Sequence, residues 1–284
     1  MNSVRSIKTI LSGTATIEGA GVHLTRAFGY HQAPQFDPFL MLDDFHTSDP
    51  AEYLAGFPWH PHRGIETITY ILEGLVEHGD SMGNSGAIGA GDVQWMTAGS
   101  GIIHQEMPQK SPTGTMWGFQ FWANLPAAQK MMPPRYRDIK AADIPEVSLE
   151  CGVTVRIISG EVGGVQGPVR EIVIDPLLLD VTVPPGTQFT LPVKDGYTVL
   201  TYVLEGAALF DPQSEQTVSR EHTVLYGHAG DRVRITTTGS LCRFLLLSGK
   251  PLGEPVAWQG PIVMNSQEEL RAAFEEYHRG TFVK

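Results

Sequence analysis

A short segment that occurs twice in this chain limits the folds that the chain can adopt. Tyr70–Gly74 reads YILEG and Tyr202–Gly206 reads YVLEG, so the two copies are offset by 132 residues. Each copy closes a β-branched and aromatic run at a glycine, which is typical of a strand that ends in a turn. A weaker similarity follows each copy, at residues 90–99 and 221–230. A repeat of this length indicates a duplicated β domain rather than a solenoid.

Turn-forming residues separate short strand-like segments along the whole chain. The 284 residues include 31 Gly and 20 Pro, which predicts many turns and therefore many short strands. Paired prolines at Pro133-Pro134 interrupt regular structure near the middle of the chain, and polar residues follow them. We therefore expect an all-β protein with two tandem domains, residues 1–137 and 138–284.

One segment near the end of the chain has a helical pattern instead. Ser266 and Glu269 have the spacing of a capping box, in which side chains satisfy the first free backbone N–H groups of a helix. Apolar residues follow at helical spacing, and Gly280 supplies a stop. The sequence predicts an amphipathic helix over 266–279 whose apolar stripe docks on a domain, with partner binding as the weaker alternative.

Charge and cysteine content exclude several classes of protein. The net charge is −11, with 20 basic and 31 acidic residues and no basic cluster, so direct binding to nucleic acid is disfavoured. Cys151 and Cys242 lie in apolar runs and are interpreted as two buried, reduced thiols. No apolar run is long enough to predict a signal peptide or a membrane span, so we expect no membrane association and a cytoplasmic location.

Two pairs of ligand-type residues stand out from this β pattern. His60 and His62 are separated by one residue, and so are His104 and Glu106. Because successive strand residues point to opposite faces, each pair places two side chains on one face. Two neighbouring strands could then direct three imidazoles and a carboxylate to one point inside a barrel. Such a set suits Fe, Mn, Ni, Cu or Zn better than Ca or Mg.

The duplicated half lacks these ligands at the matching positions. At an offset of 132, His60 and His62 correspond to Pro192 and Lys194, and at an offset of 131 His104 corresponds to Ile235. The fold therefore does not need the histidines, which favours a chemical role for them in the first half.

Several other residues have weaker claims to a functional site. Glu66 is a rival fourth ligand, or a carboxylate that orients an imidazole, but the spacing favours Glu106. Asp43 and Asp44 could border the pocket, although exposed loop acids are the preferred interpretation. The remaining histidines have no paired spacing and are interpreted as solvated or structural: His23, His31, His46, His78, His222, His228 and His278.

Five stretches together resemble the pirin family, and the similarity extends over nearly the whole chain. They are FDPFLMLD from Phe36, HPHRGIET from His60 with the following TYILEG, MTAGSGIIHQE from Met96, GFQFWANLP from Gly118, and GPIVMN from Gly260 with the helix. The resemblance implies two tandem cupin domains, which are jelly-roll β-barrels. It also implies one metal, usually iron, held in the N-terminal domain by His60, His62, His104 and Glu106.

The resemblance further implies a function. Several pirins are reported to open quercetin with dioxygen, whereas eukaryotic relatives are described as nuclear, redox-dependent transcription cofactors. We therefore expect a flavonol and O2 as substrates, with Glu106 as both ligand and base. Iron(II) is the expected cofactor, with Mn, Ni, Co, Cu or Zn as alternatives. Aromatic and apolar neighbours could form the pocket wall, although core packing explains each as well: Phe39, Met41, Phe57 and Trp59.

Three hypotheses follow for the metal. The first is a metal-dependent dioxygenase of the quercetin 2,3-dioxygenase type. The second is a non-enzymatic metal or redox sensor that binds a protein partner. The third is a closed structural metal, which would have no open coordination position.

Overall fold

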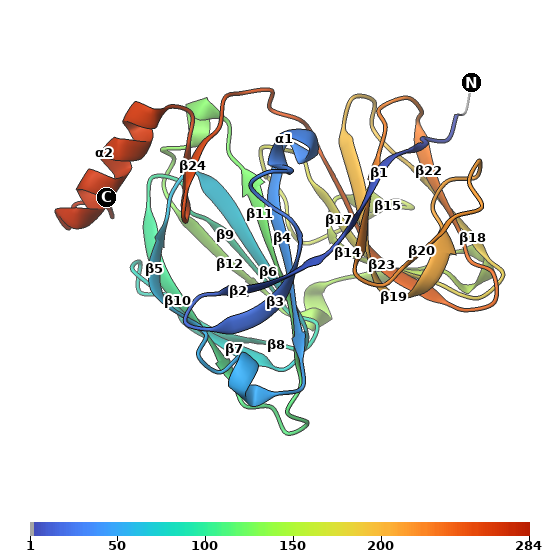
Figure 1. The fold of residues 1–284 in the computed structure, drawn as a ribbon, viewed down its shortest axis with the longest axis horizontal. Coiled ribbons are helices and arrows are strands. Elements are labelled where there is room, and N and C mark those ends of the chain that lie inside the picture. Colours follow the sequence, from blue (N-terminus) through green and yellow to red (C-terminus); the bar gives the residue numbers. More distant parts are fainter. Residues whose placement is uncertain (1–2) are drawn as a thin grey trace. The chain divides into compact units, whose positions relative to one another are not determined.

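The computed structural model describes residues 3–284, which form two compact units (Figure 1). One unit contains the paired histidines and is called the histidine unit: Thr14–Pro34, Phe39–Ala141 and Leu252–Lys284. The other is called the second unit and contains the described residues up to Gly13, Gln35–Pro38 and Ala142–Pro251.

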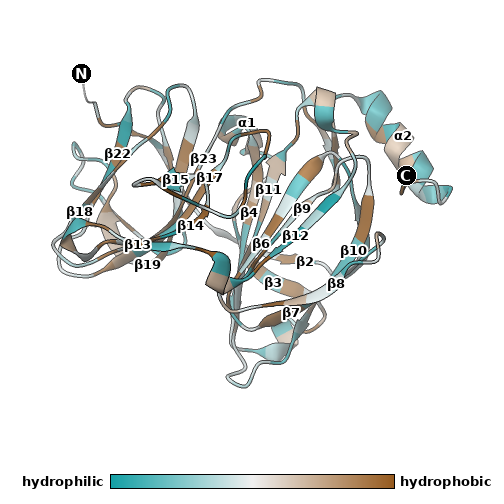
Figure 2. Ribbon diagram, turned by 180° about the vertical axis from the view of Figure 1, so that it is seen from behind, coloured by the Kyte–Doolittle hydropathy of each residue, from teal (hydrophilic) through white to brown (hydrophobic). Residues whose placement is uncertain are grey.

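The histidine unit is built from two antiparallel sheets. A seven-stranded sheet has the order β12-β9-β6-β11-β4-β3-β2, and a four-stranded sheet has the order β5-β10-β7-β8. The strands are β2 (Thr14–Glu18), β3 (Val22–Phe28), β4 (Phe39–Thr47), β5 (Phe57–His62), β6 (Ile65–Glu73), β7 (Leu75–Asp80), β8 (Ser85–Gly89), β9 (Val93–Thr97), β10 (Ile102–Gln109), β11 (Met116–Asn124) and β12 (Arg135–Ile139). Brown and teal segments alternate along these strands (Figure 2), as expected for sheets with one face toward a core.

The second unit contains a larger branched sheet. Its main path is β1-β21-β19-β23-β17-β14-β13; β20 and β22 pair with β19, and β18 pairs with β22. The strands of this unit are β1 (Ile7–Ser12), β13 (Glu146–Ser148), β14 (Thr154–Ser159), β15 (Glu161–Val162), β16 (Val165–Gln166), β17 (Leu177–Val183), β18 (Gln188–Pro192), β19 (Thr198–Leu209), β20 (Thr217–Ser219), β21 (His222–Tyr226), β22 (Arg232–Thr236) and β23 (Cys242–Gly249).

The repeated segment lies at the centre of both main sheets. Strand β6 lies between β9 and β11, and β19 lies between β21 and β23. Tyr70 and Tyr202, at matching places in these strands, are both fully buried. The segments that follow each copy form β9 and β21, the neighbours of these central strands. The all-β, two-domain prediction is confirmed, and the repeat corresponds to the core of each domain.

The end of the chain returns to the histidine unit. Strands β24 (Ala257–Gln259) and β25 (Ile262–Met264) form a ribbon, and helix α2 (Gln267–His278) packs on it. Ser266 and Glu269 form the predicted capping box. The helix is coloured mostly in the hydrophilic range (Figure 2), but Leu270 and Ala273 are buried against the ribbon. The predicted helix over 266–279 is confirmed.

The predicted domain limits differ from the compact units at both ends of the chain. Residues 252–284 belong to the histidine unit, and the described residues up to Gly13 belong to the second unit. The reason is strand pairing: β1 pairs with β21, and Val263 of β25 hydrogen-bonds to Arg63. Local sequence patterns predict strands but not the distant strands with which they pair, so the predicted limits, 1–137 and 138–284, do not follow the compact units in these segments.

The short helical elements connect the strands. They are α1 (Ala33–Phe36) and four 3-10 turns, η1 (Pro50–Glu52), η2 (Ala127–Gln129), η3 (Ala141–Asp143) and η4 (Glu150–Gly152). Cys151 lies in η4 with a φ of 60° and is exposed, so the prediction that both thiols are buried was wrong for this one. The apolar run that suggested a buried strand starts only after this turn. Cys242 is buried as predicted. None of the helices in residues 3–284 is long and apolar enough to cross a membrane.

Candidate metal centre

Two adjacent antiparallel strands bring the paired histidines together. His60 and His62 lie on β5, His104 lies on β10, and His104 is directly opposite His60 in the register of these strands. The alternation of side chains along β5 directs both of its histidines to the same face. The ligand-type nitrogens of His60, His62 and His104 all lie within 4.8 Å of one another. The predicted convergence of three imidazoles is therefore present.

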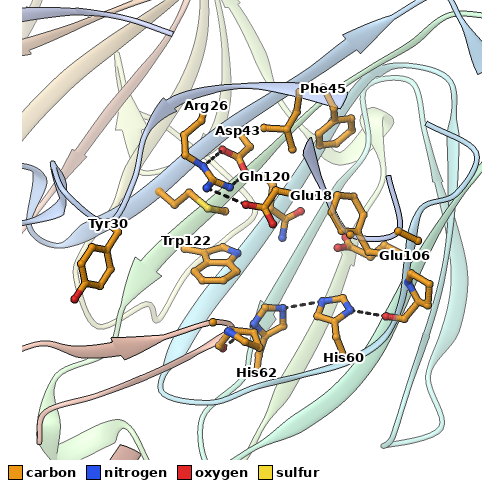
Figure 3. A pocket seen from close by; sticks show the side chains of 18 of the residues that line it. Glu18, Arg26, Tyr30, Asp43, Phe45, His60, His62, Glu106, Gln120 and Trp122 are labelled. Carbon is orange, nitrogen blue, oxygen red and sulfur yellow. Dashed lines mark hydrogen bonds and ion pairs between the residues drawn. The ribbon is translucent and has the colours of Figure 1, made fainter. Parts of the chain in front are cut away.

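Backbone carbonyls fix the orientation of two of the three rings. The Nδ1 of His60 lies 2.9 Å from the carbonyl oxygen of Pro58, and the Nδ1 of His62 lies 3.1 Å from that of Pro261. A carbonyl oxygen is an acceptor only, so each Nδ1 must carry the proton. Their Nε2 atoms lie 3.0 Å apart (Figure 3). In neutral rings these two atoms present lone pairs to each other, an unfavourable arrangement that a shared cation would relieve.

The third imidazole has no hydrogen-bond partner in residues 3–284. His104 is completely buried, and both of its ring nitrogens are unsatisfied. A buried polar nitrogen without a partner loses its interactions with water and gains nothing in exchange, so it marks a place where a ligand is expected. Burial, together with the neighbouring histidines, lowers the pKa of His104 and of His62 well below 6.5. The rings are therefore neutral at pH 7, which is the form that binds metals.

These features fit a first-row divalent metal. Metal-binding histidines usually donate their other ring N–H to a carbonyl or carboxylate, as His60 and His62 do to Pro58 and Pro261. Three neutral nitrogens suit Fe, Mn, Co, Ni, Cu or Zn rather than Ca or Mg. No other cluster in the part of the chain that the structure describes brings three potential ligands together in this way.

Glu106 lies on β10 beside the histidines but outside the tight group of nitrogens. Its carboxyl group is buried and hydrogen-bonds through Oε1 to the Thr69 hydroxyl at 2.7 Å. Burial raises the pKa of Glu106 to about 7. Thr69 also lies 2.8 Å from Oε1 of Gln120, although a hydroxyl has only one proton to donate. A protonated Glu106 that donates to Thr69 resolves this conflict, as does a Gln120 amide turned the other way. Coordination of a metal would require the ionised carboxylate.

Glu66, the alternative carboxylate, hydrogen-bonds to residues of β9. Glu66 is completely buried, and its Oε2 accepts hydrogen bonds from the Trp95 indole at 2.9 Å and from the Thr97 hydroxyl at 2.8 Å. Both partners lie on β9, the neighbour of β6 in the large sheet. These contacts hold Oε2 against β9 and give no support to the alternative that Glu66 is a ligand or orients an imidazole. Its role in the structure is to bridge two strands.

A cavity of about 630 Å³ opens beside the imidazoles. This volume lies within the range of pockets for small organic molecules. His60, His62 and Glu106 line one part of it, and the aromatic residues Tyr30, Trp122 and Trp258 line another. The ring centroids of Tyr30 and Trp258 are 5.4 Å apart, those of Trp258 and Trp122 are 5.8 Å apart, and those of Trp122 and His62 are 5.1 Å apart. A continuous row of rings therefore leads to the imidazole cluster.

The predictions for the pocket wall were partly correct. Met41 and Phe57 line the cavity, whereas Phe39 is a core residue and Trp59 is exposed outside it. Asp43 also lines the cavity and is buried in β4, so the preferred interpretation as an exposed loop acid was wrong. Asp44 is buried in the same strand and was misinterpreted in the same way.

Several residues at the site were missed by sequence reasoning. Arg26, Glu18, Gln120 and Trp258 line the cavity from β3, β2, β11 and β24, respectively. No motif joins them, because they come from distant parts of the chain. His78 could have been found, since it and Asp80 are separated by one residue, as in the other two pairs; in the structure β7 places His78 opposite Glu106. Its buried ring lies 5.4 Å from the His104 ring and hydrogen-bonds to Asp80.

The equivalent place in the second unit is filled with hydrocarbon. Ile235 of β22 pairs with Phe189 of β18, and both side chains belong to the buried core of that unit. Pro192, which matches His60, ends β18, and Lys194 lies beyond it on the surface. Of the three matching positions, only Ile235 therefore lies in the apolar core of the second unit.

Comparison with known proteins gives a consistent result. The model of the Pirin family matches residues 21–123, and the model of the Pirin C-terminal cupin domain matches residues 178–283. A pirin-like protein of Caulobacter vibrioides is 46% identical over 98% of this chain and 99% of its own length. Human pirin is 37% identical over 98% of this chain and 93% of its own.

A solved structure extends the similarity to three dimensions. The crystal structure of a quercetin 2,3-dioxygenase from Acinetobacter baumannii has a TM-score of 0.90 and 32% identity, and it covers 99% of both chains. The chain therefore has the two-cupin fold of that protein. The chain belongs to the pirin family.

Proposed function

We propose that the protein is a metal-dependent dioxygenase that opens the central ring of flavonols with O2. His60, His62, His104 and Glu106 would hold the ion. The observation that carries the proposal is the combination of three neutral imidazoles, whose free nitrogens converge, with an aromatic-walled cavity beside them. The similar protein from Acinetobacter baumannii bears the name of this activity.

The metal would supply chemistry that no side chain of the site can provide. A bound divalent ion, with iron(II) first and Mn, Ni, Co, Cu or Zn as alternatives, would act as a Lewis acid toward an ionised substrate hydroxyl and as the centre reactive with O2. The residues of the chain would position the substrate, accept its proton and keep water away.

Glu106 is suited to accept the substrate proton. A general base works best when its pKa lies near the working pH, and burial raises the pKa of Glu106 to about 7. Its Oε1 is held by Thr69, so the carboxyl group has a fixed orientation toward the cavity that it lines. In this proposal Glu106 takes the hydroxyl proton of a flavonol and also contributes an oxygen to the metal.

The aromatic row would hold a flat substrate. Tyr30, Trp258 and Trp122 present rings from the cavity wall up to His62. Stacking against such rings favours planar aromatic molecules, and their apolar surface excludes water from the reacting atoms.

The test is turnover of quercetin by protein loaded with iron(II). Loss of the flavonol absorbance and uptake of O2 are measured for wild type, His62→Ala and Glu106→Ala, with His228→Ala as a control at an exposed histidine of the second unit. We expect at least a hundredfold loss of turnover in the first two variants, because each lacks a ligand or the base, and no change in the control. Equal turnover in all four proteins would contradict the proposal. A protein that binds the metal but consumes neither flavonol nor O2 would favour the sensor hypothesis.

A further inference from the structure

A charged cluster lies in the cavity wall away from the imidazoles. The guanidinium of Arg26 makes a two-pronged contact with the Asp43 carboxylate, with Nε to Oδ1 at 2.8 Å and Nη2 to Oδ2 at 2.7 Å. Its Nη1 lies 3.0 Å from Oε1 of Glu18. Figure 3 shows these three side chains together with Gln120, and in that view Trp122 lies between them and His62. All of them line the same cavity as the histidines.

The backbone fixes this cluster in place. Arg26 and Asp43 are directly opposite each other in the pairing of β3 with β4. Glu18 ends β2, and the turn after it packs tightly on β5: the amide of Ala20 donates to the carbonyl of Gly56 at 3.0 Å. Gly19 has a φ of +58°, and a Cβ there would lie 2.6 Å from that same carbonyl oxygen. Only glycine allows this close approach, so the position of Glu18 is determined by the fold.

The charges of the cluster decide which ligand group it can receive. One cation and two carboxylates give a net charge of −1, so the cluster does not favour an anionic group. Three of the five guanidinium N–H groups are directed to Asp43 and Glu18 by these contacts, which leaves two as donors. The side chain of Glu18 is 43% exposed and offers acceptor oxygens. A neutral hydroxyl group both donates and accepts, so a pair of neighbouring hydroxyls matches this set.

We propose that Glu18 and Arg26 select flavonols that carry neighbouring hydroxyl groups on the pendant phenyl ring. This inference rests on the proposed function and deepens it. One hydroxyl donates to the Glu18 carboxylate, and its neighbour accepts from Arg26, while the row of aromatic rings supports the substrate between this cluster and the imidazoles. Glu18 and Arg26 are therefore specificity-determining residues, and Asp43 is the positioning residue that holds the guanidinium.

The experiment measures flavonol binding separately from turnover. Quercetin carries two neighbouring hydroxyls on its pendant ring, whereas galangin has none and is otherwise the same molecule. Binding to the full-length, iron(II)-loaded protein is followed without O2 by quenching of tryptophan fluorescence, since Trp122 and Trp258 line the cavity. We expect wild type to bind quercetin about a hundredfold more tightly than galangin, about tenfold for each of the two hydrogen bonds to charged groups that galangin cannot form.

The informative variant is Glu18→Gln, which keeps the shape of the side chain and removes its charge. It should weaken quercetin binding about tenfold and change galangin binding less than twofold, so that the preference for quercetin falls to about tenfold, the contribution of Arg26. Glu77→Gln is the matched control, because Glu77 is an exposed strand carboxylate of the same unit that does not line the cavity. It should retain the full preference for quercetin.

The outcomes separate this inference from the proposed function. Equal affinities in wild type, or an unchanged preference in Glu18→Gln, would overturn the selection by Glu18. Selective binding without consumption of flavonol in air would leave the selection in place and overturn the dioxygenase proposal. Failure of both flavonols to bind would overturn both.

Discussion

Two histidines of the centre owe their orientation to carbonyl oxygens that can only accept hydrogen bonds. Pro58 and Pro261 have no backbone N–H, and their carbonyls hold the Nδ1 atoms of His60 and His62. This leaves each Nε2 free and directs it toward the position where a metal would bind. These two hydrogen bonds do not depend on a metal, so its removal should leave both rings neutral and in place.

The first prediction concerns the pH dependence of stability in metal-free protein. Burial lowers the pKa of His62 and His104 well below 6.5, whereas both histidines titrate near 6.5 in the unfolded chain. Below pH 6.5 the unfolded state therefore binds more protons, and the free energy of unfolding falls as the pH falls. Each histidine contributes up to about 1.4 kcal/mol per pH unit.

Urea denaturation between pH 5 and 7.5 provides the measurement. His104→Gln should lose stability less steeply below pH 6.5 than wild type does. His228→Ala should match wild type, because His228 is exposed in the native state. Parallel pH profiles for wild type and His104→Gln would show that His104 is not protected from protonation.

The paired spacing was enough to predict the imidazole cluster, but not its surroundings. An H-x-H pair on a strand places both rings on one face whatever the rest of the fold, so His60 and His62 were accessible to sequence reasoning. Asp43 was misjudged because Arg26, the partner that holds it, lies on a neighbouring strand. Nothing in the sequence marked Arg26 as a cavity residue, because a single arginine in a strand gives no indication of the cavity that it faces.

Among the structural elements, the C-terminal ribbon and helix α2 support the metal centre. The ribbon supplies the Pro261 carbonyl that orients His62. Helix α2 contacts Arg63, the next residue, through a 2.7 Å ion pair with Glu276, and the Arg63 guanidinium lies 4.2 Å from the Phe282 ring centroid. The sequence predicted that the helix would dock on a domain. It did not predict that the docking position would be next to His62.

The second prediction is that undocking α2 weakens metal binding. Ala273→Asp places a carboxylate at a fully buried position of the helix, whereas Ala272→Asp places the same group at the exposed neighbouring position. We expect the first variant to lower the free energy of unfolding by several kcal/mol and metal affinity by about tenfold or more. The second should stay within about 0.5 kcal/mol of wild type.

Urea denaturation and a metal titration with a competing chelator measure the two effects. Equal metal affinity in both variants, with Ala273→Asp still folded, would mean that the helix does not support the site.

At the scale of the whole molecule, the two units share a strand arrangement and differ in what their interiors hold. The histidine unit contains polar, ligand-type side chains, whereas Phe189 and Ile235 help to close the interior of the second unit with hydrocarbon. The 132-residue repeat made this duplication predictable. The sequence did not predict that the start of the chain belongs to the second unit and its end to the histidine unit. This assignment depends on pairing between distant strands such as β1 and β21.

The third prediction is that the metal stabilises only the histidine unit. A ligand that binds the native state at a hundred times its dissociation constant stabilises it by about 2.7 kcal/mol. Hydrogen exchange of metal-free and metal-loaded protein should therefore show slower exchange in β5, β10 and β25, and unchanged exchange in β18 and β22. Equal protection in both sets of strands would contradict a single site in the histidine unit.

The most direct measurement is a crystal structure of metal-loaded protein, with anomalous scattering recorded at the absorption edge of the metal. We predict one strong peak about 2.0–2.2 Å from the Nε2 atoms of His60 and His62 and from a ring nitrogen of His104, with a Glu106 oxygen completing the protein ligands. A peak within the second unit, or no peak among these three imidazoles, would contradict the account.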